Sequence, residues 1–149
     1  MIKVQSFGIP LDLNSFESFK GLVGIDLPED YVKFLKEYNG GEPEDCVGYL
    51  SEVSIEDYAI QDFFGMNLEV YNDLKKVYTS YINILPENCI AIAEVVGGDK
   101  ICMSLKSNNF GTIWYWCHDE HDDGEDLEKL YFVANTFTDF IESLAPDEG

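Results

Sequence analysis

Apolar residues recur every three to four positions in several stretches of this chain, the spacing of a helix with one buried face. The clearest stretch covers residues 28–41, where the apolar stripe consists of Tyr31, Phe34, Leu35 and Tyr38. Pro28 suits the first turn because it has no N–H to leave unpaired, and the acids Glu29 and Asp30 lie at the positive end of the helix dipole. Residues 39–41, Asn-Gly-Gly, are expected to end this helix because they readily adopt the left-handed conformation.

Three further segments show the same periodicity. The first is predicted to begin at Asn14 or Ser15, where Asn14 and Glu17 fit a capping box. The second is predicted to begin at Asn67, and the last at Thr136, with an acidic residue three positions later. The side chains expected to face inward in these helices are Phe16, Phe19, Leu22, Val23, Val70, Tyr71, Leu74, Val77, Tyr78, Tyr81, Phe137, Phe140, Ile141 and Leu144.

Short apolar runs bounded by turn residues predict strands. Gly97-Gly98 is typical of a tight hairpin, residues 42–45 form an acidic turn around a proline, and residues 107–111 form a looser turn. Helices near the ends and strands mainly in the middle favour an α+β fold in one domain, residues 1–149, with a central, mostly antiparallel (mixed) sheet and helices packed against it. The predicted strands cover residues 2–7, 47–53, 60–64, three stretches within 90–117, and 129–134.

The composition is that of a folded protein. Of 149 residues, 46% are apolar and 14% aromatic, enough to form a core. The first residues do not resemble a signal peptide and no apolar run reaches membrane-spanning length, so a cytoplasmic location is expected. The four cysteines show no C-x-x-C spacing, so Cys89, Cys102 and Cys117 are expected to be buried reduced thiols, and no metal or cofactor is predicted.

Net charge narrows the range of partners. The sequence has 29 Asp+Glu against 9 Lys+Arg, a formal net charge of −20. Phosphate repulsion disfavours direct binding to nucleic acid, and an anionic membrane surface is disfavoured for the same reason. A basic protein partner is compatible with this charge, and so is a role in solubility alone. The sequence leaves the oligomeric state open.

The most acidic stretch lies at residues 119–128, and its acids are Asp119, Glu120, Asp122, Asp123, Glu125, Asp126 and Glu128. A calcium loop would need ligands at set positions, which Asp119 and Asp123 fit and His121 does not. A transition-metal site built on His118 and His121 has no further His or Cys at suitable spacing. The stretch is therefore interpreted as a loop that docks a basic partner, or as one that is simply charged.

Aromatic residues offer a second kind of contact. Trp114 and Trp116 are two apart in a predicted strand and so point to the same face. At least one of the two is expected in the core, and Tyr49 is a weaker candidate for an exposed contact. The sequence contains no nucleophile elbow, P-loop or dinucleotide fingerprint. A small carboxylate-dependent hydrolase is the enzymatic alternative, and an enzyme is not predicted.

The identities of particular residues, and not only the spacing of apolar positions, resemble those of a known family. Residues 27–41 read L-P-x-x-Y-x-x-F-L-x-x-Y-N-G-G, which resembles the signature of the SUKH superfamily, a large group of mostly bacterial immunity proteins that includes fungal cell-wall-assembly regulators. Further segments follow in the family's order, at residues 85–93, 97–105, 111–120 and 133–144. The resemblance implies a structural role for Pro28, Tyr31, Asn39, Gly40, Gly41 and Phe140. The Trp of the family's matching strand looks structural, which implies that Trp116 is in the core and that Trp114 is partly buried beside it.

The resemblance implies an immunity protein that binds and occludes a cognate bacterial toxin without catalysis. A nuclease is the expected toxin, because a domain that binds a polyanion carries a basic face that this chain complements. The alternative is a non-enzymatic interaction module in a regulatory or cell-wall-signalling complex. The residues predicted to contact the partner are Glu42, Glu44, Asp45, Tyr49, Trp114, Asp119, Glu120, Asp122, Asp123, Glu125 and Asp126.

Overall fold

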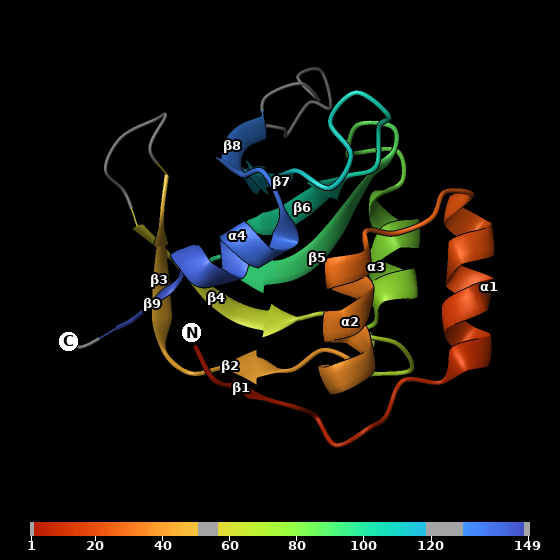
Figure 1. Ribbon diagram of the computed structural model, residues 1–149, viewed down its shortest axis with the longest axis horizontal. Coiled ribbons are helices and arrows are strands. Elements are labelled where there is room, and N and C mark those ends of the chain that lie inside the picture. Colours follow the sequence, from red (N-terminus) through yellow and green to blue (C-terminus); the bar gives the residue numbers. More distant parts are fainter. Residues whose placement is uncertain (1, 51–56, 119–129, 148–149) are drawn as a thin grey trace.

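The computed structural model describes residues 2–50, 57–118 and 130–147. These residues form four helices and a curled, seven-stranded antiparallel sheet (Figure 1), which confirms the predicted α+β class. The helices are α1 (Leu13–Val23), α2 (Glu29–Tyr38), α3 (Leu74–Tyr81) and α4 (Phe137–Ser143). The sheet strands are β3 (Cys46–Tyr49), β4 (Asp57–Phe63), β5 (Cys89–Val95), β6 (Lys100–Ser104), β7 (Ile113–Trp116), β8 (Leu130–Ala134) and β9 (Ala145–Pro146).

The order of strands in the sheet largely follows their order in the sequence. Its strand order is β8-β7-β6-β5-β4-β3-β9, so most neighbours in space are also neighbours in sequence. Gly97 and Gly98, with φ of 104° and 109°, make the predicted tight turn between β5 and β6. Two short strands, β1 (Val4–Gln5) and β2 (Glu42–Pro43), form a separate ladder. The predicted acidic turn at residues 42–45 therefore begins with paired, extended backbone.

Aromatic rings join α2, α4 and the sheet into one core. The Phe34 ring centroid lies 5.0 Å from those of both Phe63 and Phe137, and Tyr31 lies 5.1 Å from Phe137. At the surface, Asp30 accepts hydrogen bonds from the backbone N–H and the hydroxyl of Thr138, both at 2.9 Å. The predicted α2 stripe is thus the contact between this helix, the sheet and α4 (Figure 1).

Asn39 ends α2 as predicted and also ties distant segments together. Its φ is 49°, in the left-handed region, and its side chain is 1% exposed. The amide donates to the carbonyl oxygens of Ile9 and Met66 at 3.0 and 2.9 Å, and accepts from the Met66 N–H at 2.7 Å. A buried amide with all these partners fixes the chain before α1 and the chain after β4 against the end of α2.

Two helix starts differ from the sequence prediction. The N-cap of α1 is Asp12 rather than Asn14 or Ser15, and Leu22, expected inside, is 48% exposed. The predicted start of the next helix at Asn67 is wrong, because α3 begins only after Asp73, whose carboxylate accepts from the Lys76 N–H at 3.0 Å.

The segment between Asn67 and Asp73 forms a turn instead of helix. The N–H of Gly65 donates to the Asn72 carbonyl at 3.0 Å, and the N–H of Asn72 donates to the Glu69 carbonyl at 2.9 Å. Asn67 itself has a φ of 60°. Val70 and Tyr71, expected on the buried stripe, are consequently 52% and 84% exposed.

Other predicted positions agree with the structure. Thr136 caps α4 by accepting from the Asp139 N–H at 3.0 Å. Cys89 and Cys102 are buried thiols as expected, whereas Cys117, also expected to be buried, is half-buried. Among the helices described, none has both the length and the apolar character that a membrane span requires.

Candidate partner-binding surface

The predicted contact residues on the N-terminal half lie at one edge of the sheet. Glu42, Glu44 and Asp45 are exposed on β2 and the corner that follows it. Glu44 accepts from the backbone N–H of Lys3 at 2.8 Å, which fixes this corner to β1. Tyr49, at the end of β3, is 60% exposed. The second predicted cluster, Asp119, Glu120, Asp122, Asp123, Glu125 and Asp126, lies outside the described residues and stays a prediction.

Strand β4 extends this surface with acids that the sequence reasoning missed. Asp57 is the cross-strand partner of Tyr49, and Asp62 is the partner of Glu94 on β5. An irregularity between Ile60 and Asp62 inserts an extra residue in β4. Such a bulge places two successive polar residues, Gln61 and Asp62, on the exposed side between buried Ile60 and Phe63.

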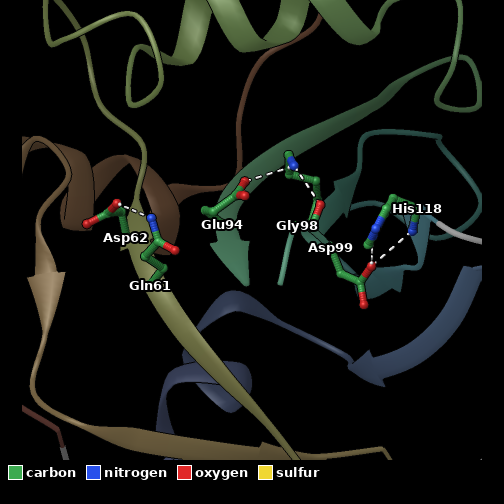
Figure 2. A network of polar contacts seen from close by, with 7 residues as sticks. Gln61, Asp62, Glu94, Gly98, Asp99 and His118 are labelled. Carbon is green, nitrogen blue, oxygen red and sulfur yellow. Dashed lines mark hydrogen bonds and ion pairs between the residues drawn. The ribbon is translucent and has the colours of Figure 1, made fainter. Parts of the chain in front are cut away.

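The carboxylate of Asp62 at this bulge lies near two others, those of Glu42 and Glu94. Burial raises the pKa of Asp62, and the nearby charges of Glu42 and Glu94 raise it further, against a hydrogen bond from Gln61. Figure 2 shows Asp62 and Glu94 on neighbouring strands. Like charges opposite each other in a sheet cost stability, and only Glu94 of this pair has a lysine beside it, Lys100. We call Glu42, Tyr49, Asp57, Asp62 and Glu94 the acidic sheet face.

A buried lysine, Lys100, lies beneath Glu94 and pairs with it. Lys100 Nζ lies 2.8 Å from Glu94 Oε1 and donates to the Gly98 carbonyl at 2.8 Å. It also lies 5.2 Å and 5.9 Å from the ring centroids of Tyr81 and Trp116. Its side chain is only 8% exposed, so it supports Glu94 from inside. The sequence contains no lysine or arginine between Lys36 and Lys75, so β2, β3 and β4 carry acids alone.

Trp114 lies elsewhere on the sheet. Its indole N–H donates to the Thr112 hydroxyl at 2.8 Å, and its ring meets that of Phe132 edge to face at 5.4 Å. As predicted, it is half-buried and Trp116 is core, at 4% exposed. Strands β4, β5 and β6 separate its strand from that of Tyr49. The structure therefore does not place Trp114 beside Tyr49.

A polar cluster precedes the predicted acidic loop. Asp99 accepts from the Tyr115 hydroxyl, from the His118 backbone N–H at 3.0 Å, and from the His118 imidazole at 2.5 Å (Figure 2). Burial raises the pKa of the Asp99 carboxyl, but these hydrogen bonds outweigh it, so the net shift of its pKa is downward. Burial, and then the hydrogen bond to Asp99, raise the pKa of Tyr115. The cluster fixes the backbone where residues 119–128 begin.

A groove of about 1090 Å³ lies between β1, α2 and α4 and is lined by residues such as Val32, Phe34 and Ile141. It contains neither the acidic sheet face nor the Asp99–His118 pair. Within residues 2–50, 57–118 and 130–147, no cluster of three or more His, Cys, Asp or Glu side chains could hold a metal ion.

Comparison with known proteins agrees with the resemblance read from the sequence. Residues 10–143 match the model of the SMI1/KNR4 family (SUKH-1). The chain is also similar to the SPbeta prophage-derived uncharacterized protein YokK of Bacillus subtilis (strain 168). The two are 29% identical over 155 residues, covering 91% of this chain and 77% of that protein.

Proposed function

Because the chain belongs to the SMI1/KNR4 family (SUKH-1), which includes immunity proteins, we propose that it is an immunity protein that neutralises one cognate bacterial toxin. Neutralisation takes place by binding: the chain covers the toxin's active site in a stoichiometric complex, without turnover and without a cofactor. The complex forms in the cytoplasm of the cell that is protected. The similarity to a prophage-derived protein supports a mobile, bacterial setting for such a pair.

The acidic sheet face is the observation that carries the proposal. Glu42, Asp57 and Asp62 have no lysine or arginine near them in sequence. Glu94 is paired with Lys100, but the charges of Glu42 and Glu94 still disfavour the charged form of Asp62, at a cost in stability. A basic partner removes that cost by placing ammonium or guanidinium groups between the carboxylates. A nuclease fits this description, because its substrate is a polyanion and its active-site face is correspondingly basic.

Charged and aromatic side chains make different contributions to the proposed binding. The acids raise the rate of encounter with a basic surface and orient the two proteins. Tyr49, exposed beside Asp57, supplies rigid area that is buried on contact, as aromatic residues do at the centres of interfaces. The predicted loop at residues 119–128 adds negative charge, and its contribution to the interface is part of the proposal.

Affinity capture from a lysate of the source organism tests the proposal. The full chain is immobilised, and bound protein is eluted first at low and then at high salt. A basic protein with a toxin domain, released by salt and lethal when expressed without this chain, is the expected result. A set of weakly bound cellular proteins, with no toxin among them, would favour the interaction module in a regulatory complex.

A matched pair of variants localises the interface. The first combines Glu42→Gln, Asp57→Asn and Asp62→Asn on the acidic sheet face. The control removes the same three charges elsewhere, at the exposed residues Glu37, Glu87 and Glu142. The first variant is expected to lose capture and the control to keep it. Equal capture by both would show that total charge, rather than this face, recognises the toxin.

A further inference from the structure

A second candidate contact surface consists of exposed apolar side chains and one tyrosine, away from the acidic sheet face. Ile9, Leu13, Val70 and Tyr71 are 43%, 62%, 52% and 84% exposed, and we call them the Tyr71 patch. They precede or begin α1 and α3, which lie at the right of Figure 1, whereas β3 lies at the left. Exposed apolar side chains that gather in this way mark contact surfaces.

Hydrogen bonds bring the two halves of this patch together. The Asn39 amide donates to the carbonyls of both Ile9 and Met66, so the two segments meet at one buried group. The Asn67 amide donates to the Ser15 hydroxyl at 2.9 Å, a second link between the same segments. The patch is therefore a built surface whose side chains are exposed by the fixed course of the backbone.

A groove opens beside the patch, between α1 and α3. Its volume is about 670 Å³, and its lining includes Val70, Ser18, Lys75 and Thr79. The phenol of Tyr71 does not line this groove in its own molecule. A groove with an apolar wall and hydroxyl and ammonium groups suits a tyrosine ring, which has an apolar body and a polar tip.

The charges around the patch are of both signs. Asp12 and Glu69 flank Leu13 and Val70 in sequence, and Lys75 and Lys76 line the groove. Over the rest of a chain with a net charge of −20, a second copy meets mainly repulsion. A rim with both signs of charge can pair its lysines with the acids of a second copy around a two-fold axis.

We propose that the Tyr71 patch is a homodimer contact, in which Tyr71 of each copy enters the α1–α3 groove of the other. The proposal is independent of toxin binding, since the acidic sheet face stays open on both copies. A stable interface needs about 800 Å² from each partner, more than four partly exposed side chains supply. The dimer is therefore weak and concentration-dependent.

Sedimentation equilibrium of the purified full chain, from about 5 µM to about 500 µM, tests the proposal. Tyr71→Ser is compared with Tyr49→Ser, a matched control because both rings are largely exposed. The wild type and Tyr49→Ser are expected to approach the mass of a dimer, and Tyr71→Ser to dimerise about tenfold more weakly or worse. A monomer at every concentration, or equal dimerisation of both variants, would overturn the proposal.

Charge exchange supplies a second, independent readout. A Lys75→Glu, Lys76→Glu variant and a Glu69→Lys variant are each mixed with themselves and with one another. Native mass spectrometry is expected to detect more mixed dimer than dimer of the Lys75→Glu, Lys76→Glu variant. Statistical mixing would contradict the proposed pairing. Both experiments use this chain alone, so their failure is distinct from a failure to capture a toxin.

Discussion

Tyr49 and Tyr71 are exposed tyrosines in opposite electrostatic surroundings. Tyr49 is paired across the sheet with Asp57 and belongs to a region of sequence without lysine. Tyr71 lies two residues from Glu69, beside a groove that Lys75 and Lys76 line. Exposed aromatic rings are typical of contact surfaces, and the surrounding charge suits each place to a different partner. We propose a basic partner for the first and a second copy of this chain for the second.

The largest expected effect comes from removing the support of the Tyr71 patch. Asn39→Ala leaves the Met66 N–H and two carbonyls without their buried partner. Each unsatisfied group costs about 1–3 kcal/mol, and alanine tolerates the left-handed φ of 49° less well than asparagine does. We expect the free energy of unfolding to fall by about 3 kcal/mol or more, measured by urea denaturation. Asn83→Ala, at an exposed position, is the control and should change little.

A smaller loss of stability is expected from a change at Gly48, next to Tyr49. Gly48 lies opposite Tyr58 in the β3–β4 ladder, and a Cβ at Gly48 would overlap the Tyr58 ring. Gly48→Ala therefore forces the buried ring to move, at a cost of about 1–3 kcal/mol. Urea denaturation measures the loss, and Gly21→Ala, where a Cβ meets nothing within 4 Å, is the control. Equal stability of the two variants would mean that Tyr58 can shift freely.

Salt separates the two surfaces by the size of its effect. Raising the salt concentration from about 0.05 M to about 0.5 M screens the attraction of the acidic sheet face for a basic toxin. Between two copies of this chain it screens both their net repulsion and the lysine–acid attraction across the Tyr71 patch, so the two changes offset each other. Toxin association should slow about tenfold, while dimerisation should change by less than about twofold. Stopped-flow mixing measures the first and sedimentation the second. A tenfold loss in both would break the comparison.

The smallest effect concerns the pKa of Asp62. Because burial and the neighbouring acids raise its pKa in the folded state, its charged form costs stability above that pKa. Asp62→Asn should therefore raise the free energy of unfolding at pH 7 by less than about 1 kcal/mol, since the group is largely solvated. The gain should vanish as the pH falls below the unfolded-state pKa, near 3.8. Denaturation at pH 7 and pH 3.5 measures the difference.

Replacing Asp99 should change the free energy of unfolding in the opposite direction to replacing Asp62. Its pKa is lowered by hydrogen bonds from Tyr115 and His118 that outweigh burial, so its charged form stabilises the fold. Asp99→Asn should lower the free energy of unfolding at pH 7, and the loss should shrink as the pH falls through the lowered pKa of Asp99. If both variants changed stability in the same direction at pH 7, the assignment of the two carboxylates would be wrong.

Local chemistry in the sequence predicted the parts of the fold that depend on near neighbours. The α2 stripe, the stop at Asn39 and the Thr136 cap of α4 involve residues within one or two turns of each other. The same is true of the Gly97-Gly98 turn. Of the candidate site, the exposed corner at Glu42, Glu44 and Asp45 and the exposure of Tyr49 could be read from charge and pattern, because each depends on one short stretch.

What the sequence could not determine depends on hydrogen bonds and strand pairs between distant residues. Asn67 and Asp73 are both good caps, and the tie from Gly65 to Asn72 decides that only Asp73 begins a helix, which in turn exposes Tyr71. Asp62 and Glu94 face each other because a bulge in β4 shifts the register with β5. A one-residue shift moves a side chain to the opposite face of a sheet, so periodicity along one strand cannot locate such a pair. The sequence by itself determined the elements and the excess of acid, and the tertiary structure decided where that acid gathers.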